Sequence, residues 1–331
     1  MPLNIINSLT IGKYAKKAAD PIWVAVGGGS IIANSTNGNA WTAVAADKRG
    51  GITPTSYEEM DVAYGNGRWV AVGSGSLIAY SSNGSSWTAA TTKGGITLGR
   101  GVAYGNGMWV VVGTGSIIAY SSNNGVTWTA ADQMYLTTGH DVAYGTDGVG
   151  NGRWVAAGQG SFLSYSSNGI NWSRATTLPY FGNYPSRVAY ANGRWVAVGD
   201  GTAIAYSSNG SNWTSVPLAS RGGFTFGSGV AYGTDGAGNG RWVVVGRGGT
   251  IIAYSSDNGV TWTAAATIGG ITVGQDVAYG TDEAGNGRWV VVGQGSVFAT
   301  SPNGNEWTAA ATTGGITSAG DVLASVAFKT I

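Results

Sequence analysis

Two stretches of the 331-residue chain combine side chains that could bind a polar ligand. They read ADQMYLTTGH at 131–140 and RATTLPYFGNYPSR at 174–187. Aromatic rings stack on the apolar faces of sugars, while amides and charged groups pair with hydroxyls. These residue types therefore favour a carbohydrate- or receptor-binding site. The candidate ligand-binding residues are Asp132, Gln133, Tyr135, His140, Arg174, Tyr180, Phe181, Asn183 and Tyr184, together with Tyr57 from an earlier stretch.

Both stretches stand out because they depart from a repeated pattern. The five corresponding stretches carry Gly-Gly-Ile-Thr or Gly-Gly-Phe-Thr, at 50–53, 94–97, 222–225, 269–272 and 314–317. Loops that differ from their equivalents are candidates for function, because a scaffold presents function on loops. In the competing interpretation, the aromatic residues fold back onto the rim and anchor their own loops.

The sequence offers little for catalysis or for cofactor and metal binding. There is no Cys, and the single His140 would need a partner within hydrogen-bond reach to act as a base. Glu58 and Glu59 are adjacent and point apart on an extended segment, so they do not form a glycosidase pair. The turns 146–151, 234–239 and 281–286 each carry too few oxygen ligands for calcium. We expect no enzymatic activity, no cofactor and no metal.

Composition excludes several other classes of protein. Lys and Arg total 17 against 16 Asp and Glu, so a duplex-binding face and a nucleic-acid partner are not expected. The chain has no apolar run of the length that spans a bilayer, so we expect no membrane insertion. Its 58 Gly would suggest disorder, but 43% hydrophobic residues indicate a packed core.

A repeat positions the candidate residues. The 14 Trp form seven pairs, and equivalent Trp recur at a mean spacing of about 44 residues, which is typical of propeller blades. The pairs are 23/41, 69/87, 109/128, 154/172, 195/213, 242/262 and 289/307.

One unit predicts four antiparallel strands. From Val62 it reads VAYGNG, RWVAVG, SGSLIAYSS and NGSSWTAA, so each β-rich run ends in Gly or Asn-Gly. We expect strands at 62–65, 68–73, 76–82 and 86–90. The second and third runs are apolar on both faces, as stacked blades require. The fold class is all-β.

The two ends of the repeat complement each other. The first unit lacks a first strand before Ile22–Val24, and residues 325–328 copy the missing motif. We therefore predict a seven-bladed β-propeller over 22–331, closed by the C-terminal strand completing the first blade, with an N-terminal arm at 1–21. Closure removes free sheet edges. An open solenoid would instead need capping repeats.

In such a ring, the connections between units share a face with the turns between second and third strands. These turns are short Gly-x-Gly elements whose central residue varies, which could form several similar small sites with avidity. The alternative is that a tight turn tolerates any side chain at its tip. The central residues are Gly28, Ser74, Thr114, Gln159, Asp200, Arg247 and Gln294.

The turn Ser255–Trp262 matches the pattern S-x-D-x-G-x-T-W of Asp-box propellers, also called BNR or sialidase-like repeats. Residues 121–128 match with Asn123 in place of Asp, and the other five copies are shortened. The chain resembles this family over 22–331. The resemblance implies that the box is a structural turn on the face opposite the usual binding site.

The resemblance does not extend to the catalytic residues of sialidases. Their R-I-P motif is absent, and the nearest fragment is Ser186-Arg187-Val188. Charged residues are too sparse for the sequence to place an arginine triad. The resemblance therefore implies a propeller that is not an active sialidase.

The repeated phrases WVAVG and YSSNG-x-x-W also resemble repeats of bacterial and bacteriophage surface or tail proteins. We expect a non-enzymatic carbohydrate- or receptor-binding propeller of a phage tail or fibre, located on the virion surface or outside the cell. The expected partners are a cell-surface glycan or receptor and, through the N-terminal arm, other virion proteins. The alternatives are a structural module that binds proteins through its rim, and a glycosidase with two carboxylates near the channel.

Overall fold

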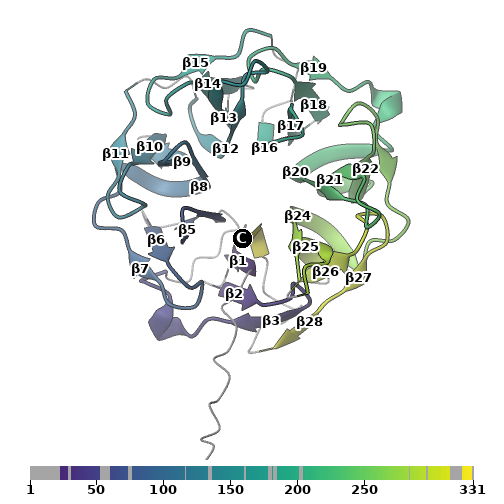
Figure 1. Cartoon of the computed structure of the whole chain (residues 1–331), viewed down its shortest axis with the longest axis horizontal. Helices are drawn as coiled ribbons and strands as arrows, with labels where there is room; N and C mark the ends of the chain where they lie inside the picture. The colour runs from purple at the N-terminus through teal and green to yellow at the C-terminus, as the bar shows by residue number, and fades with distance from the viewer. Residues whose placement is uncertain are drawn as a thin grey trace, which may run out of the picture.

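The chain forms a closed ring of seven β-sheets around a central axis (Figure 1). The computed structural model describes residues 23–28, 31–52, 60–73, 77–115, 117–132, 136–159, 162–177, 181, 185–200, 204–282, 284–295, 297–313 and 323–329. The predicted N-terminal arm at 1–21 lies outside these residues. Two 3-10 turns, η2 (Ala46–Lys48) and η3 (Leu218–Ser220), interrupt the connections. Within the described part of the chain, no helix could cross a membrane.

Each sheet, or blade, runs from an innermost strand at the axis to a short outer strand. The innermost strands of blades 1 to 7 are β29 (Leu323–Phe328), β4 (Asp61–Gly65), β8 (Ile96–Gly105), β12 (Gly139–Thr146), β16 (Pro185–Ala191), β20 (Phe224–Thr234) and β24 (Ile271–Thr281). The second strands are β1 (Trp23–Gly27), β5 (Arg68–Gly73), β9 (Met108–Gly115), β13 (Gly152–Gly158), β17 (Arg194–Gly199), β21 (Gly240–Gly249) and β25 (Gly287–Gly295).

The third and fourth strands follow in the same order. The third strands are β2 (Ile31–Ser35), β6 (Leu77–Ser81), β10 (Ile118–Ser121), β14 (Phe162–Ser166), β18 (Ile204–Ser207), β22 (Ile252–Ser255) and β26 (Phe298–Ser301). The outer strands are β3 (Ala40–Ala43), β7 (Thr88–Ala89), β11 (Thr129–Ala130), β15 (Ser173–Arg174), β19 (Thr214–Ser215), β23 (Thr263–Ala264) and β27 (Thr308–Ala309). The predicted strands and their antiparallel order are confirmed.

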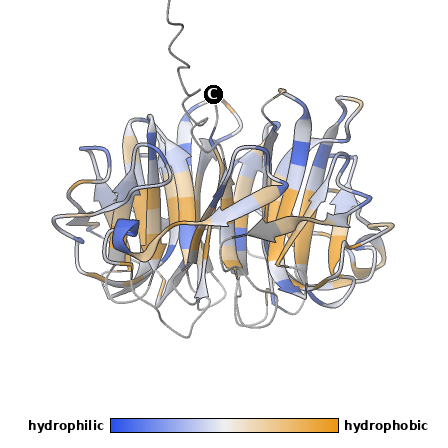
Figure 2. Cartoon of the chain, turned by 90° about the horizontal axis from the view of Figure 1, so that it is seen from below, coloured by the Kyte–Doolittle hydropathy of each residue, from blue (hydrophilic) through white to orange (hydrophobic). Residues whose placement is uncertain are grey.

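The hydrophobic core lies between the blades. Each of seven clusters joins two neighbouring blades, and together they form a hydrophobic band across the middle of the ring (Figure 2). The second strands are buried because both of their faces are covered. All 14 Trp are at most 6% exposed, so they pack the blades and do not form a sugar-binding platform.

The seven turns between third and fourth strands use one local device. In blade 2, Asn83 Oδ1 accepts bonds from the backbone N–H groups of Ser85 and Ser86. Gly84 takes a φ of +69°, which favours glycine. The Trp87 indole then donates to the Gly84 carbonyl at 3.3 Å. Asn, Gly and Trp thus each support this turn, through a side-chain acceptor, a positive φ and an indole donor.

The C-terminal strand closes the ring as predicted. Trp23 of β1 pairs with Phe328 of β29, and their ring centroids lie 4.9 Å apart. Blade 1 differs from the prediction by a fifth strand, β28 (Ala311–Thr313), which pairs in parallel with β3. The last strand and the segment that precedes it therefore both attach to the first blade.

The structure corrects the predicted Gly-x-Gly turns in blades 3, 6 and 7. In these blades the element belongs to the second strand and pairs with an extended innermost strand, as in the pairs Ile96↔Gly115, Phe224↔Gly249 and Ile271↔Gly295. The Gly-Gly-Ile/Phe-Thr stretches supply the partner residues. Connections between units and the turns between second and third strands thus share a face, as predicted.

Candidate ligand site at the channel mouth

The candidate site is built by β-bulges at the start of the innermost strands. In blade 4, Gly139 pairs with Gly158 and Asp141 with Ala157, so the register shifts at His140, which is the extra residue of the bulge. Equivalent register shifts occur in five further blades. A bulge redirects a side chain out of the alternating pattern. The extra residues are Ala324, Arg100, His140, Ser186, Ser228 and Gln275.

Five of these extra residues line one hollow of about 210 Å³, the channel-mouth pocket. The pocket opens on the face of the connections between blades, opposite the C-terminal end of β29 that lies uppermost in Figure 2. Its lining is Met60, Arg100, His140, Arg187, Phe226, Ser228, Arg247, Val273, Gln275 and Ala324.

The lining of the pocket has two chemically different sides. Blades 3 to 6 contribute Arg100, His140, Arg187 and Arg247. Blades 7, 1 and 2 contribute the apolar Val273, Ala324 and Met60, together with the polar Gln275 of blade 7. An anionic group with an adjoining apolar substituent therefore fits the arrangement.

Arg247 reaches the pocket from the extended hairpin of blade 6. Its guanidinium carbon lies 3.9 Å from the centroid of the Phe226 ring, so a cation–π contact orients the side chain. Phe226 and Arg247 are also strand partners in β20 and β21. The third arginine of the pocket is thus held in place by the longer strands of this blade.

Three aspartates lie behind the pocket and join neighbouring blades; we call Asp61, Asp141 and Asp276 the aspartate cluster. Asp61 accepts a bond from the backbone N–H of Val102 at 2.8 Å, in the next blade. The other two make the same bond, to Val188 and Val326. Each aspartate therefore latches its innermost strand to the following one.

Ser325 links two members of the cluster where the ring closes. Its hydroxyl lies 2.6 Å from Asp61 Oδ1 and 2.9 Å from Asp276 Oδ2. A serine hydroxyl has one proton to donate. A protonated Asp276 would supply the second proton that two full hydrogen bonds require.

Burial raises the pKa of two of these carboxyl groups. Burial raises the pKa of Asp141 to about 7, against the opposing effect of the Arg187 charge. Burial also raises the pKa of Asp276 to about 6, again opposed by Arg187. Burial acts to lower the pKa of Arg187 itself, but the aspartate cluster holds it above its ordinary value. Arg187 is therefore the positive charge that the cluster shares.

The structure separates the predicted site residues that it describes. His140 lines the pocket on the innermost strand of blade 4, whereas Arg174 is exposed on β15, the outer strand of that blade. Asp132 is exposed just after the outer strand of blade 3. The two residues are therefore not brought together with His140.

Phe181 is 1% exposed and packs with Val188 and Trp213 in a core cluster. Its ring therefore anchors its segment and offers no face to a ligand, which corrects the assignment of Phe181 as a ligand-stacking residue. Six further candidates lie outside the residues that the structure describes, so their assignment stays a prediction. They are Gln133, Tyr135, Tyr180, Asn183, Tyr184 and Tyr57.

Sequence reasoning missed the three arginines of the pocket as a group. Two of them stand in a repeated frame in which Val-Ala-Tyr follows a variable pair, as in Gly-Arg-Gly-Val at 99–102 and Pro-Ser-Arg-Val at 185–188. The variable pair within this constant frame could have identified the channel-lining positions. Arg247 was among the variable central residues of the Gly-x-Gly elements, but nothing in the sequence indicates that its side chain faces the channel.

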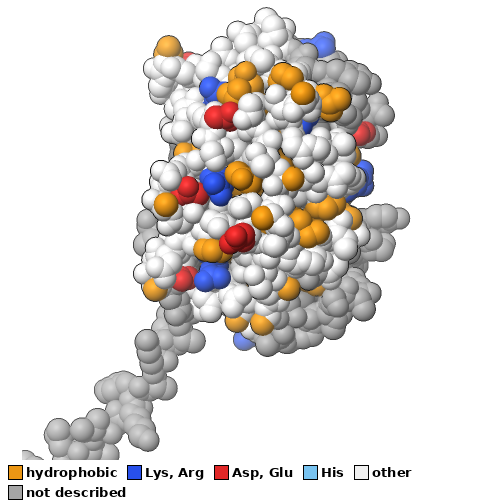
Figure 3. Space-filling view, turned by 90° about the vertical axis from the view of Figure 1, so that its right-hand side faces the viewer, with side chains coloured by type: hydrophobic (Ala, Val, Ile, Leu, Met, Phe, Trp, Pro, Cys, Tyr) orange, Lys and Arg blue, Asp and Glu red, His pale blue; other side chains and the backbone are white. Residues whose placement is uncertain are grey.

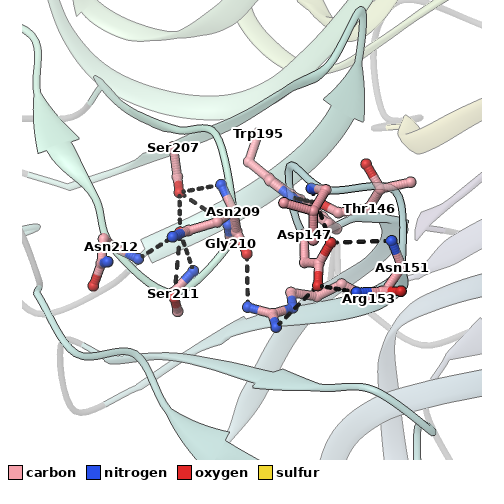
Figure 4. Close-up of polar contacts among 11 residues, drawn as sticks. Thr146, Asp147, Asn151, Arg153, Trp195, Ser207, Asn209, Gly210, Ser211 and Asn212 are labelled. Atoms are coloured by element: carbon pink, nitrogen blue, oxygen red, sulfur yellow. Dashed lines mark hydrogen bonds and ion pairs between the residues drawn. The ribbon is translucent and has the colours of Figure 1, made fainter.

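The opposite face carries the longer turns between first and second strands. In blade 4, Asp147 accepts bonds from the backbone N–H groups of Val149 and Asn151 and from the Asn151 side chain (Figure 4). These bonds engage both carboxylate oxygens within the turn, so Asp147 orders the loop and is not arranged for calcium. Arg153 then donates to the carbonyl of Asn209 in the neighbouring blade at 2.8 Å.

No protein-family model matches the chain, and no curated protein sequence is similar to it. Among solved structures, a GH74 enzyme of Niastella koreensis matches with a TM-score of 0.54 and 19% identity, over 86% of this chain. This chain spans 43% of the length of that enzyme.

Two structures of YCF48 are also similar. One is bound to D1 peptide and matches with a TM-score of 0.59 and 18% identity, over 85% of this chain and 88% of that one. The other, from Cyanidioschyzon merolae, has a TM-score of 0.51 and 14% identity, over 75% and 83%. At these identities the comparisons show the propeller fold alone.

Proposed function

We propose that this propeller is a non-enzymatic binding module that recognises an acidic glycan or receptor on a cell surface through the channel-mouth pocket. The proposed location is a virion surface, on a phage tail or fibre, or otherwise outside the cell. Similarity of the repeats to phage and bacterial surface proteins supports this location. Docking to other virion proteins through the N-terminal arm is part of the same proposal.

The convergence of arginines is the observation that carries the proposal. Arg100, Arg187 and Arg247 come from three different blades and line a single hollow. Among the described residues that line it, none is a carboxylate. Like charges that converge repel each other, and an anionic ligand relieves that repulsion through charge-assisted hydrogen bonds.

The apolar side of the pocket narrows the ligand class. Met60, Val273 and Ala324 would contact an apolar substituent next to the anionic group. A carboxylate sugar with an acetamido or methyl group has this combination. Gln275 and Ser228 are polar lining residues that could pair with hydroxyls.

The aspartates near the channel bear on the glycosidase alternative. Two carboxylates do converge there, on Ser325. However, the cluster is engaged by backbone N–H groups of adjacent blades, and its members are not part of the pocket lining. A latch role accounts for these contacts, and so we keep the non-enzymatic proposal.

A protein partner is the second candidate. The YCF48 structure with a bound D1 peptide is a similar propeller that holds a peptide. A peptide with a free terminal carboxylate presents the same anionic chemistry to the three arginines. On the side of the ring shown in Figure 3, hydrophobic side chains form small separate groups. The described residues on that side therefore form no continuous apolar patch of the kind that would favour rim-mediated assembly.

A glycan array with matched acidic and neutral glycans tests the proposal, using wild type, Arg247→Ala and Arg174→Ala. The last variant removes an exposed arginine from an outer strand and controls for net charge. We expect preference for acidic glycans and a loss of about 10- to 100-fold in affinity for Arg247→Ala, as for a lost charge-assisted bond. Equal binding of neutral glycans, or equal loss in both variants, would contradict the proposal.

A peptide series separates the two candidates. Peptides with a free terminal carboxylate are compared with the same peptides amidated at the C-terminus. Binding only of the free-carboxylate peptides, with no glycan bound, would replace the glycan proposal with the protein-partner alternative.

A further inference from the structure

We propose that anion binding at the channel-mouth pocket is coupled to protonation of the aspartate cluster behind it, so that the ligand binds more tightly as the pH falls from 8 to 6. This inference rests on the proposed function, because it requires the pocket to take an anion. It adds a proton as a second ligand of the same site.

Arg187 is the structural link between the pocket and the cluster. Its side chain lines the pocket. It donates to the backbone carbonyl of His140 at 3.4 Å, directly before Asp141 in the chain. It also interacts electrostatically with all three aspartates of the cluster. One cation therefore serves both an incoming anion and carboxylates that are already in place.

The charge balance makes the two roles of Arg187 compete. When the cluster is fully ionised, three negative charges, those of the buried Asp61 and Asp141 and of the half-buried Asp276, act on this one guanidinium. An anion in the pocket adds a further negative charge on the other side of the guanidinium. The repulsion is relieved when a carboxylate takes up a proton.

The cluster can hold such a proton without losing its latches. Protonated Asp276 could donate to the Ser325 hydroxyl, which lies 2.9 Å away, while that hydroxyl donates to Asp61. In Asp141 the backbone N–H of Val142 bonds Oδ1 and that of Val188 bonds Oδ2. A proton on Oδ1 would therefore leave the latch from Oδ2 to Val188 in place. The raised pKa values of Asp141 and Asp276 bring this protonation into the physiological range.

The effect of other charged groups around the pocket on the pH dependence must be distinguished from the effect of the aspartate cluster. Strand β8 supplies Arg100, β16 supplies Arg187 and β21 supplies Arg247. Guanidinium groups in proteins are effectively always charged, so arginine as a residue type is not a pH switch. Strand β12 supplies His140, which titrates in this pH range in ordinary surroundings and would also attract an anion when charged. The variants below distinguish His140 from Asp141.

Isothermal titration with sodium sulfate at constant ionic strength tests the coupling, because sulfate does not itself titrate between pH 6 and 8. Buffers of different ionisation enthalpy report the protons taken up on binding. We expect proton uptake at pH 7 and an affinity that rises by about 3- to 10-fold per proton-linked pH unit toward the acid side. We expect His140→Gln to retain the uptake and Asp141→Asn to lose most of it.

Asp141→Asn replaces one acceptor oxygen by an amide and could lower stability, so a measurement on wild type accompanies it. Side-chain carboxyl ¹³C shifts followed by NMR give the pKa of Asp141 with and without sulfate. We expect sulfate to raise this pKa. Sulfate binding without proton uptake, or uptake abolished only by His140→Gln, would overturn the coupling. Absence of sulfate binding would also overturn it, while the glycan array decides the proposed function separately.

Discussion

Asp141 Oδ2 lies 2.8 Å from the backbone nitrogen of Val188. A side chain of blade 4 thus accepts a hydrogen bond from a backbone N–H of the innermost strand of blade 5. The same bond joins blades 2 and 3 through Asp61 and Val102. A third copy joins blades 7 and 1 through Asp276 and Val326. The wall of the channel is thus held together by carboxylates, and burial raises the pKa of two of them, Asp141 and Asp276, which ties stability to pH.

The free energy of unfolding should fall as the pH rises from 5 to 8. The ordinary pKa of an aspartate, 3.8, applies to the unfolded chain, whereas the folded values are about 7 for Asp141 and about 6 for Asp276. Between these limits the folded state binds more protons, so this contribution is complete below pH 3.8 and is lost as the pH rises through the folded pKa values. We expect a loss on the order of a few kcal/mol.

Thermal unfolding at constant ionic strength from pH 4.5 to 8.5 measures this effect. Asp147, Asp235 and Asp282 have lowered pKa values, chiefly through bonds from Asn side chains. Their ionised forms therefore stabilise the fold, and this stabilisation is lost only when more acid pH protonates them. The melting temperature should therefore be highest at the acid end of this range and fall toward pH 8. A melting temperature that stays level or rises toward pH 8 would show that the cluster is not strained by ionisation.

Phe328→Ala should weaken the closure of the ring. The Phe328 ring packs 4.9 Å from that of Trp23, and its removal should cost about 2–4 kcal/mol. Urea unfolding measures the loss, and amide hydrogen exchange locates it in β29. Tyr64→Ala is the matched control, since Tyr64 packs on Trp69 at the same 4.9 Å inside a blade without a chain end. Unchanged exchange in β29 would argue against Phe328 as a closure residue.

Gly145→Ala should destabilise the ring through a clash with the next blade. A Cβ at Gly145 would lie 2.1 Å from Cγ of Tyr190. We expect a loss of about 2–4 kcal/mol in wild type. In a Tyr190→Ala background the ring is gone and only the Cβ of residue 190, at 2.6 Å, remains close, so the added loss should be smaller than in wild type. A double-mutant cycle measures this coupling, and additive losses would show that the contact does not matter.

Asp257→Ala and Asp257→Asn should differ in the turn of blade 6. The Asp257 carboxylate accepts bonds from the Ser255 hydroxyl and from the Val260 and Thr261 amides. Alanine removes all of them and should cost about 1–2 kcal/mol. Asparagine should be nearly neutral, because Asn123 occupies the equivalent place and donates to Thr127. Equal losses measured by urea unfolding would assign the effect to charge.

The repeat made the fold predictable because it reports strand order and count at once. Seven Trp pairs fixed the number of blades, and the copy of the first-strand motif near residue 325 located the closure. The fifth strand of blade 1 was not predictable. Residues 311–313, Ala-Thr-Thr, match the equivalent residues 266–268, Ala-Thr-Ile, which form no strand, so the sequence does not mark them as a strand.

The site was less predictable for a physical reason. A bulge breaks the two-residue alternation from which side-chain direction is inferred, so alternation alone did not show that Arg100 and Gln275 face the channel. The aromatic segments drew attention by composition, but Phe181 uses its ring to fill the core. Of the ten predicted residues, His140 is the one that the described structure places in the pocket.

The pairing of β1 with β29 also sets the order in which the molecule can be completed. During translation six blades can leave the ribosome with all four of their strands, while the first waits for a segment that emerges after every other blade. Until then the edge of β1 stays open to strands of other chains. Slow elongation between β27 and β29 would prolong that exposure, so this fold is most vulnerable to aggregation just before β29 emerges.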